Sequence, residues 1–196
     1  MRQARTDFPE LWVLRHGETE WNTEERLQGR LDSALTSTGL DQARVQGQIL
    51  KSCLPGAARV ISSDAPRALR TAEIALAGLP LSIETDSRLA EIDLGRWQGR
   101  TLEELRAVHP DIARATDPHL WKFSAPGGET LGQMAARVQA VLEGLTGPTV
   151  LVTHGVTSRL LRCIVLGLPI TDLASVPGGQ GVVHHIRDGK AQILTA

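Results

Sequence analysis

Short apolar runs alternate along this chain with longer segments in which apolar residues recur every three or four positions. The short runs predict strands at residues 11–14, 58–61, 81–84, 149–153, 182–186 and 191–194. The periodic segments predict helices at residues 36–52, 64–77, 101–108, 131–145 and 156–166. Because strands alternate with helices, we expect an α/β fold, a three-layer α/β/α sandwich around a mostly parallel sheet.

The last two predicted strands differ from the others because no helix separates them. The pair Asp188-Gly189 lies between them and favours a tight turn, so we expect a C-terminal hairpin at the edge of the sheet. The chain shows no repeat or low-complexity tract, and its 196 residues suit one hydrophobic core. Residues 1–196 are therefore predicted to form a single domain.

Three segments lack a clear period. Residues 17–35 are predicted to form a long loop over a binding site, and residues 91–99, which contain two glycines, a second loop. Residues 111–122 have a pattern that does not decide between helix and loop.

Two of the predicted strands end in a His-Gly pair. Residues 11–14 run into Arg15-His16-Gly17, and residues 149–153 run into His154-Gly155. Ligands of open α/β sheets bind outside the carboxyl ends of the strands, so both imidazoles are expected in one crevice. The strand at 58–61 would bring Arg67 to the same edge. A single histidine after a strand is more often structural, and it is the convergence of these groups that indicates a site.

Arg15, His16, Arg67 and His154 would place up to four cationic groups around one point. Such a cluster needs an anion, and arginine pairs match phosphate oxygens. The helix after Gly155 is expected to add backbone N–H groups, and phosphate can use more of these donors than a carboxylate can. The sequence contains neither a metal-ligand cluster nor a nucleotide-type glycine-rich loop, so we expect no metal and no cofactor.

Composition excludes several classes of protein. Lys and Arg number 21 and Asp and Glu 22, a net charge of -1 that argues against a general nucleic-acid or membrane surface. No stretch approaches the roughly 18 apolar residues of a membrane span, and residues 1–10 lack the apolar core of a secretory signal. Cys53 and Cys163 are isolated, and we expect both to be reduced core thiols of a cytoplasmic protein.

The stretch from Arg15 to Asn22, RHGETEWN, resembles the signature of the histidine phosphatase superfamily, in its phosphoglycerate-mutase-like branch. Further similar blocks follow in the family's order between about Leu11 and Leu166. They are Gln28-Gly29, Asp32 to Leu35, Ser62-Ser63-Asp64 with Arg67, Leu89 to Gly99 with Glu91, Pro126 to Glu129, and Thr153-His154-Gly155 with Arg159. The chain departs from many relatives at Val156, where they have a second glycine or another small residue.

The resemblance implies that His16 is phosphorylated during turnover and that Glu91 donates the proton to the leaving group. It also implies phosphate contacts from Arg15, Arg67 and His154 and further substrate contacts from Asn22, Gln28, Gly29 and Gly155. His16 must be neutral to attack phosphorus, with its other ring nitrogen donating to a backbone carbonyl. The neighbouring arginines should lower the pKa of the Glu91 carboxyl.

A phosphatase that hydrolyses a small phosphomonoester is the favoured function. The alternatives are a phosphoglycerate mutase and a phospho-ligand-binding module without turnover. Mutases of the family have a longer segment with paired arginines where this chain has residues 101–124, with only Arg106, Arg114 and Lys122 scattered along them. The identity of the substrate and the oligomeric state stay open.

Aromatic residues and the last histidines complete the predictions. Trp21, Trp97, Trp121 and Phe123 are candidates for either the substrate pocket or the core. His184 and His185 are predicted to be strand residues without a catalytic role, with side chains on opposite faces of the sheet.

Overall fold

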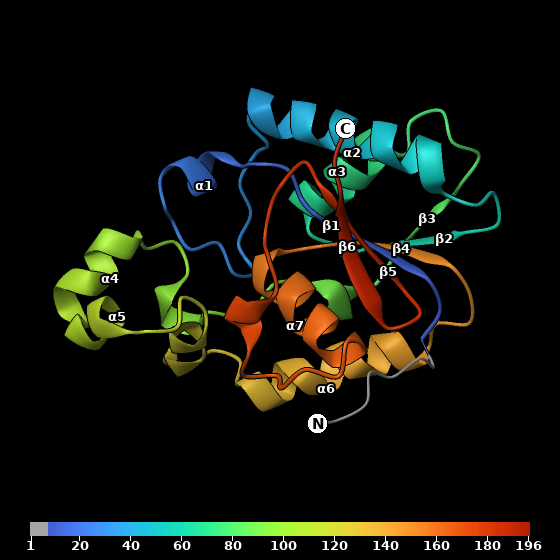
Figure 1. Cartoon of the computed structure of the whole chain (residues 1–196). Coiled ribbons are helices and arrows are strands. Elements are labelled where there is room, and N and C mark those ends of the chain that lie inside the picture. Colours follow the sequence, from blue (N-terminus) through green and yellow to red (C-terminus); the bar gives the residue numbers. More distant parts are fainter. Residues whose placement is uncertain (1–7) are drawn as a thin grey trace.

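The structure, a computed structural model, describes residues 8–196 and contains a six-stranded sheet in the order β3-β2-β4-β1-β5-β6 (Figure 1). The strands are β1 (Leu11–Arg15), β2 (Arg59–Ser62), β3 (Ile83–Thr85), β4 (Thr149–Thr153), β5 (Val183–Arg187) and β6 (Lys190–Leu194). The pairs β1·β4, β2·β4 and β2·β3 are parallel, and β5 is antiparallel to both β1 and β6. The predicted mostly parallel sheet with a hairpin at its edge is confirmed.

Helices cover both faces of this sheet (Figure 1). The α-helices are α1 (Glu20–Thr23), α2 (Ser37–Cys53), α3 (Pro66–Ala75), α4 (Leu102–Val108), α5 (Pro110–Arg114), α6 (Leu131–Glu143) and α7 (Gly155–Val165). Four 3₁₀ helices lie at Ser87–Leu89, Gly95–Trp97, Leu120–Ser124 and Leu173–Ser175. Helices α2 and α3 lie on one side of the sheet and α6 and α7 on the other, which confirms the three-layer α/β/α architecture.

Alternate residues of β1 supply the cores of the two interfaces. Trp12 and Leu14 pack in a cluster with residues of α2 and α3, whereas Leu11 and Val13 pack with residues of α6 and α7. All five residues of β4 are buried. A central parallel strand that is covered on both faces has no polar side, which explains its continuous apolar run.

The C-terminal hairpin has the predicted turn. Asp188 and Gly189 have positive φ angles of 50° and 69°, as the two central residues of a type I′ turn require. His184 and His185 face opposite sides of β5, as predicted. His184 lies 3.2 Å from the Arg162 side chain on α7, and His185 stacks on Trp12 with ring centroids 5.1 Å apart.

The irregular segments contain more structure than their patterns predict. Residues 17–35 contain the one-turn helix α1. Thr19 and Asn22 form a capping box at its N-terminus. A helix of one turn is too short to show an apolar period. Residues 111–122 are part of a projection built from α4, α5 and the 3₁₀ helix Leu120–Ser124, which extends to one side of the sheet (Figure 1).

The prediction that both cysteines belong to the core is wrong for Cys53. Cys163 is buried in α7, but Cys53 is exposed. Cys53 is the last residue of α2, where the helix runs past the edge of the core and its neighbours Lys51 and Ser52 are also exposed. In residues 8–196, no helix has the length and apolarity that crossing a bilayer requires.

Two helical glycines allow a matched test of the packing between α2 and α3. A Cβ on Gly47 of α2 would lie 2.5 Å from the carbonyl oxygen of Ala75, whereas a Cβ on Gly132 of α6 would meet nothing within 4 Å. We expect Gly47→Ala to lower the free energy of unfolding by about 1–3 kcal/mol, because the helices must separate. Gly132→Ala should be neutral or stabilising by up to about 1 kcal/mol, since alanine favours the helix. Urea unfolding of both variants measures the difference, and equal effects would contradict the close approach of the two helices.

Candidate active site

The two His-Gly junctions lie next to each other because β1 and β4 are paired strands. Arg15 pairs with Thr153 in the register, and the His16 backbone N–H donates to the Thr153 carbonyl at 2.9 Å. The rings of His16 and His154 have centroids 5.2 Å apart and planes inclined by 59°. The structure thus places the two imidazoles next to each other, as the strand pattern predicts, but only that of His16 lines the cavity at this edge of the sheet.

His16 is oriented as a nucleophile requires. Its Nδ1 lies 2.7 Å from the carbonyl oxygen of Gly17, and because a carbonyl can only accept, Nδ1 carries the proton. Its Nε2 therefore has the free lone pair, and no group within residues 8–196 forms a hydrogen bond to it. Burial, with help from His154 and Arg15, holds the pKa of His16 well below its ordinary value, so the ring is neutral.

A cavity of about 110 Å³ lies beside His16. The predicted site residues that line it are Arg15, His16, Asn22, Gln28, Gly29, Arg67 and Glu91. His154 is not among its lining residues, and its Nε2 lies 2.9 Å from the Ser63 hydroxyl. Its buried Nδ1 has no hydrogen-bond partner, and burial and the nearby arginines keep the pKa of His154 well below the ordinary value.

The two predicted phosphate-binding arginines are held differently. The side chain of Arg67 is 1% exposed. It donates to the carbonyls of Gly29 and Leu31 and to the carboxylate of Asp32, at 2.7 to 2.9 Å. By contrast, the Arg15 guanidinium has no hydrogen-bond partner among residues 8–196. Burial lowers the pKa of Arg15, although the Glu91 carboxylate opposes this effect.

Glu91 occupies the helix terminus that we expected to bind the anion. Its carboxylate accepts from the backbone N–H groups of Val156 at 3.0 Å, Thr157 at 3.1 Å and Ile92 at 3.0 Å, and from the Thr157 hydroxyl at 3.1 Å. The expectation that this end of α7 donates freely to phosphate is therefore wrong at Val156 and Thr157. The Glu91 carboxylate thus caps the N-terminus of α7 and interacts with the positive end of the helix dipole.

The pKa of Glu91 is lowered, as predicted, but the main causes differ from the arginines we expected. Burial raises the pKa of this carboxyl, and the backbone N–H groups of Val156 and Ile92 and the charge of Lys122 more than offset that effect. The ionised carboxylate is thus the stable form before a ligand brings further negative charge into the site.

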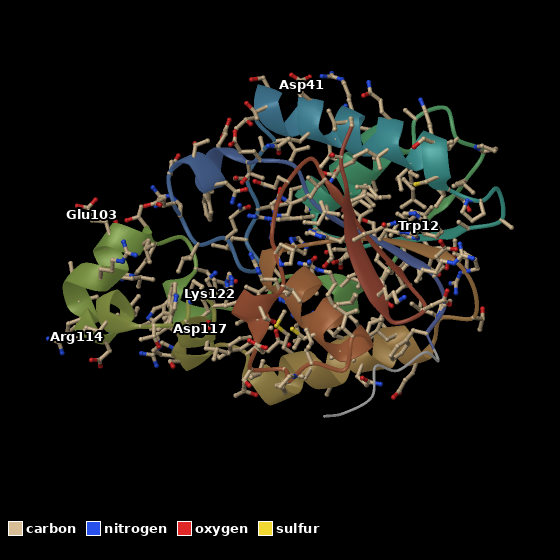
Figure 2. The ribbon with its side chains drawn as sticks, viewed as in Figure 1. Trp12, Asp41, Glu103, Arg114, Asp117 and Lys122 are labelled. Atoms are coloured by element: carbon tan, nitrogen blue, oxygen red, sulfur yellow. The ribbon has the colours of Figure 1, made fainter. Side chains whose placement is uncertain are left out.

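Sequence reasoning missed Lys122 and Gln180. Lys122, from the 3₁₀ helix Leu120–Ser124, lines the same cavity as His16, and burial lowers its pKa. Figure 2 shows Lys122 close to Asp117 where the α4–α5 projection joins the body. The Gln180 amide donates to the His16 carbonyl and to the Asn22 side chain, both at 3.1 Å. Both residues come from segments without an apolar period, so no sequence signal places them at the site.

Asn22 and Gln28 present amide groups to the cavity. The Asn22 oxygen accepts from Thr19 and Gln180, which leaves its amide nitrogen for a ligand. The Gln28 nitrogen donates to the Thr19 hydroxyl at 2.6 Å, while its buried oxygen has no partner. Rotation of the Gln28 amide by 180° would let the Thr19 hydroxyl donate to that oxygen and would turn the NH₂ group towards a phosphate.

Gly155 lies between two catalytic candidates. A Cβ at this position would be 3.5 Å from the Arg15 guanidinium and 3.6 Å from a Glu91 oxygen. Val156 follows it, is 3% exposed and forms part of the wall of the cavity. In residues 8–196, no group of three or more His, Cys, Asp or Glu side chains is arranged to hold a metal ion. The groups directed at the cavity are mainly cationic donors, which suit an oxyanion.

An outer cavity of about 410 Å³ shares Asn22, Arg26, Leu27 and Lys122 with the cavity beside His16. Trp21 and Trp121 line this outer cavity, whereas Trp97 is buried in the core and Phe123 packs against it. Trp121 also packs against this core, so it belongs to both the cavity wall and the core, whereas Trp21 is a wall residue alone.

Comparison with known proteins identifies the class of protein that has this fold and site. The family model of the histidine phosphatase superfamily (branch 1) matches residues 11–193, and the chain belongs to this superfamily. A curated protein of Salmonella paratyphi C, named "Probable phosphoglycerate mutase GpmB", is 36% identical over 165 residues, which are 82% of this chain and 76% of that protein. The resemblance deduced from the motifs is confirmed.

Solved structures support the same assignment. The mycobacterial glucosyl-3-phosphoglycerate phosphatase Rv2419c, in a complex with VO3, has a TM-score of 0.75 and 30% identity, with 95% of this chain and 97% of that chain covered. The α-ribazole phosphatase of Shigella flexneri has a TM-score of 0.78 over 95% of each chain. At 23% identity, the second comparison shows a shared fold only.

The neutral histidines predict how stability depends on pH. The pKa values of four histidines are lowered, to about 4 for two of them; the four are His16, His154, His119 and His184. In the unfolded chain each takes up a proton below about pH 6.5, while the folded protein keeps them neutral. Unfolding is therefore coupled to proton uptake, and the free energy of unfolding should fall between pH 6.5 and 4, by up to about 1.4 kcal/mol per pH unit for each histidine.

Urea unfolding at several pH values between 7.5 and 5 measures this slope. His119→Asn removes one of the four histidines. The slope of the free energy of unfolding against pH should then be shallower, by up to about 1.4 kcal/mol per pH unit. Stability that stays constant over this range would contradict the neutral state of the histidines in the folded protein.

Proposed function

We propose that this protein is a phosphatase that hydrolyses a small phosphomonoester through a phosphohistidine intermediate on His16. The observation that carries the proposal is the free Nε2 of a neutral His16 beside an oxyanion-sized cavity, together with the unpaired guanidinium of Arg15. The superfamily membership supports it, as does the relative solved with VO3.

In the first step, Nε2 of His16 attacks phosphorus, the N–P bond forms and the ester P–O bond breaks. Arg15, Arg67 and the amide of Asn22 hold the phosphoryl oxygens, and His154, whose ring lies 5.2 Å from that of His16, is the further contact that the family resemblance implies. Glu91 gives its proton to the departing alkoxide. Its lowered pKa is compatible with this role because the bound phosphate dianion raises the proton affinity of a neighbouring carboxylate.

In the second step, a water molecule attacks the phosphohistidine. Glu91, now ionised, accepts a proton from the water as the new P–O bond forms and the N–P bond breaks. His16 returns to its neutral form, with Nδ1–H still donating to the Gly17 carbonyl. Glu91 is protonated again and phosphate leaves, so atoms and charges balance over the cycle.

The outer cavity favours a phosphatase over a mutase. Its cationic lining residues are Arg26, Arg106 and Lys122, and the acidic side chains of Glu25 and Asp117 also line it. Arg114 does not line it. A wall of mixed charge does not resemble the paired arginines that hold a carboxylate in the mutases. Mutase activity is the first alternative function, because one curated relative is named a probable phosphoglycerate mutase. A phospho-ligand-binding module without turnover is the second alternative.

We also propose that the enzyme acts without a metal ion and works in the cytoplasm. Arginine and lysine side chains supply the positive charge that a metal would otherwise provide. Both cysteines are free thiols, as expected for a reducing compartment.

Replacement of the nucleophile tests the central step. His16→Ala should lower turnover of phosphomonoesters by on the order of 10³-fold or more and abolish acid-labile incorporation of labelled phosphate, because the variant lacks the Nε2 that forms the N–P bond. Rapid quench with a labelled ester measures the incorporation. His185→Asn, which removes an imidazole on the far side of β1, is the control and should retain both activities. An acid-labile phosphoenzyme in His16→Ala would remove His16 as the nucleophile.

The role of Glu91 is tested by the leaving group. Glu91→Gln should slow phosphoenzyme formation from alkyl phosphates by about 10²- to 10⁴-fold, because their alkoxides need a proton. The loss should be less than about tenfold for p-nitrophenyl phosphate, whose leaving group is stable as an anion. A melting curve of the variant monitors the helix cap that Gln weakens. Equal losses for both esters would mean that Glu91 positions the substrate and that the proton comes from elsewhere.

Metal dependence is tested directly. Activity towards p-nitrophenyl phosphate should be unchanged within about twofold after dialysis against EDTA, because the cationic side chains supply the charge stabilisation. The initial rate before and after dialysis is the measurement. Loss of activity that Mg²⁺ or Zn²⁺ restores would show that the proposal of metal-independent catalysis is wrong.

A further inference from the structure

A second cavity, of about 150 Å³, lies next to the one beside His16, and the proposed mechanism does not use it. The two cavities share four lining residues, Arg15, Glu91, Lys122 and Val156. The remaining wall of the second cavity comes mainly from one face of α7, from Gly178 and Gly179, and from His184 on β5.

Two arginines of α7 line this second cavity without a carboxylate partner. Within residues 8–196, neither Arg159 nor Arg162 forms an ion pair. Arg162 is 2% exposed, and among the described residues its guanidinium forms hydrogen bonds only with the carbonyl of Ser158 at 3.0 Å and Nδ1 of His184 at 3.2 Å. A buried charge without a counter-ion is costly, so this arrangement calls for an anion.

Within residues 8–196, no carboxylate shifts the pKa of Arg162, although burial lowers the pKa of Arg159 and the charge of Asp117 opposes this effect. Burial lowers the pKa of His184 to about 4, so its ring is neutral and Nδ1 accepts from the arginine. Burial and the charge of Arg159 lower the pKa of Arg162 to about 10, which still leaves it charged at neutral pH. Arg159 donates through Nη1 to the carbonyls of Leu173 and Val176, and its Nε and Nη2 have no partner in the described residues.

Polar atoms without partners border the same cavity. Ser158 is 2% exposed, lines the cavity, and has a hydroxyl without a hydrogen-bond partner. Arg15 Nε and His119 Nδ1 are two further buried atoms without a partner, and both residues line the cavity. Buried polar groups are rarely left unsatisfied, and three around one cavity indicate a missing ligand that bonds to them.

The acidic residue on this wall does not neutralise the cluster. Glu91 is the one carboxylate that lines the cavity within residues 8–196, and α7 backbone N–H groups occupy its oxygens. Arg15, Lys122, Arg159 and Arg162 therefore outnumber it. The cavity is also larger than the one beside His16, so a phosphate or a carboxylate group fits its volume.

We propose that this second cavity is an oxyanion site in which Ser158, Arg159 and Arg162 hold a phosphate or carboxylate group beside the phosphoryl-transfer pocket. The group is either a free anion or a second anionic group on the substrate, since both cavities meet at Arg15 and Glu91. The site itself does not depend on turnover; the substrate-borne case rests on the proposed function.

Counting bound inorganic phosphate tests the site. In equilibrium dialysis with labelled phosphate, the wild-type chain should bind two ions and Arg162→Met one. Arg44→Met removes a charge on the surface of α2, where it pairs with Asp41, and should still bind two. A single phosphate on the wild-type protein at saturation would overturn the proposal.

A second pair of variants keeps the test decisive if Arg162→Met does not fold. Ser158→Asp places a carboxylate next to the unpaired arginines and should displace the second phosphate while raising the melting temperature. Ser158→Asn has the same size without the charge and should not raise it. A lower melting temperature in Ser158→Asp than in Ser158→Asn would contradict the proposal that a negative charge at this position stabilises the unpaired arginines.

The source of the anion is decided with two esters of similar size, phosphoglycolate and 2-hydroxyethyl phosphate, of which only the first carries a carboxylate. If the substrate supplies the anion, Arg162→Met should lower the ratio of their kcat/KM values roughly 10- to 100-fold. If the ratio is unchanged and the second phosphate is lost, the site takes a free anion. Two bound phosphates without turnover of any ester would disprove the proposed function alone, and one bound phosphate with normal turnover would disprove the second site alone.

Discussion

The pairing of β1 with β4 is the constraint on which the candidate site depends. These two parallel strands are far apart in the sequence, yet their register places Arg15 opposite Thr153 and joins His16 to Thr153 by a backbone hydrogen bond. A slip of one residue would turn Leu11 and Val13 to the wrong helical layer, so the two hydrophobic interfaces specify the register. The imidazoles of His16 and His154 then lie together as a consequence of core packing.

Uncompensated positive charge is the second organising feature. Arg67 is held by carbonyls and Asp32, but the Arg15 guanidinium has no partner in the described chain. The histidines avoid adding to this charge because burial keeps them neutral. The N-terminus of α7, which would otherwise attract an anion, is closed by Glu91. An oxyanion bound here would therefore interact mainly with side chains, and the backbone N–H groups at the N-terminus of α7 lower the pKa of the Glu91 carboxyl.

Glu91 and Arg15 line both the cavity beside His16 and the second cavity. A ligand in the second cavity would therefore lie next to the proposed proton donor. The pocket beside His16 has the volume for a phosphoryl group, and the outer cavity with Trp21 and Trp121 has room for a leaving group. The second cationic cavity extends from the same wall towards α7 and β5. An anion there would act on the pKa of Glu91 through space, because only short distances and low-dielectric protein separate them.

The sequence by itself determined the layers, the mostly parallel sheet and the two His-Gly junctions, because burial on one or both faces imposes periods that can be read along the chain. It also carried the family motifs with Arg15, Arg67 and Glu91. Only the tertiary structure decided the contacts of Lys122 and Gln180, the closure of α7 by Glu91, and the meeting of Ser158, Arg162 and His184 at one cavity. These contacts join loops without a period, or elements far apart in the sequence. Which residues meet depends on tertiary packing, and a local sequence pattern does not indicate it.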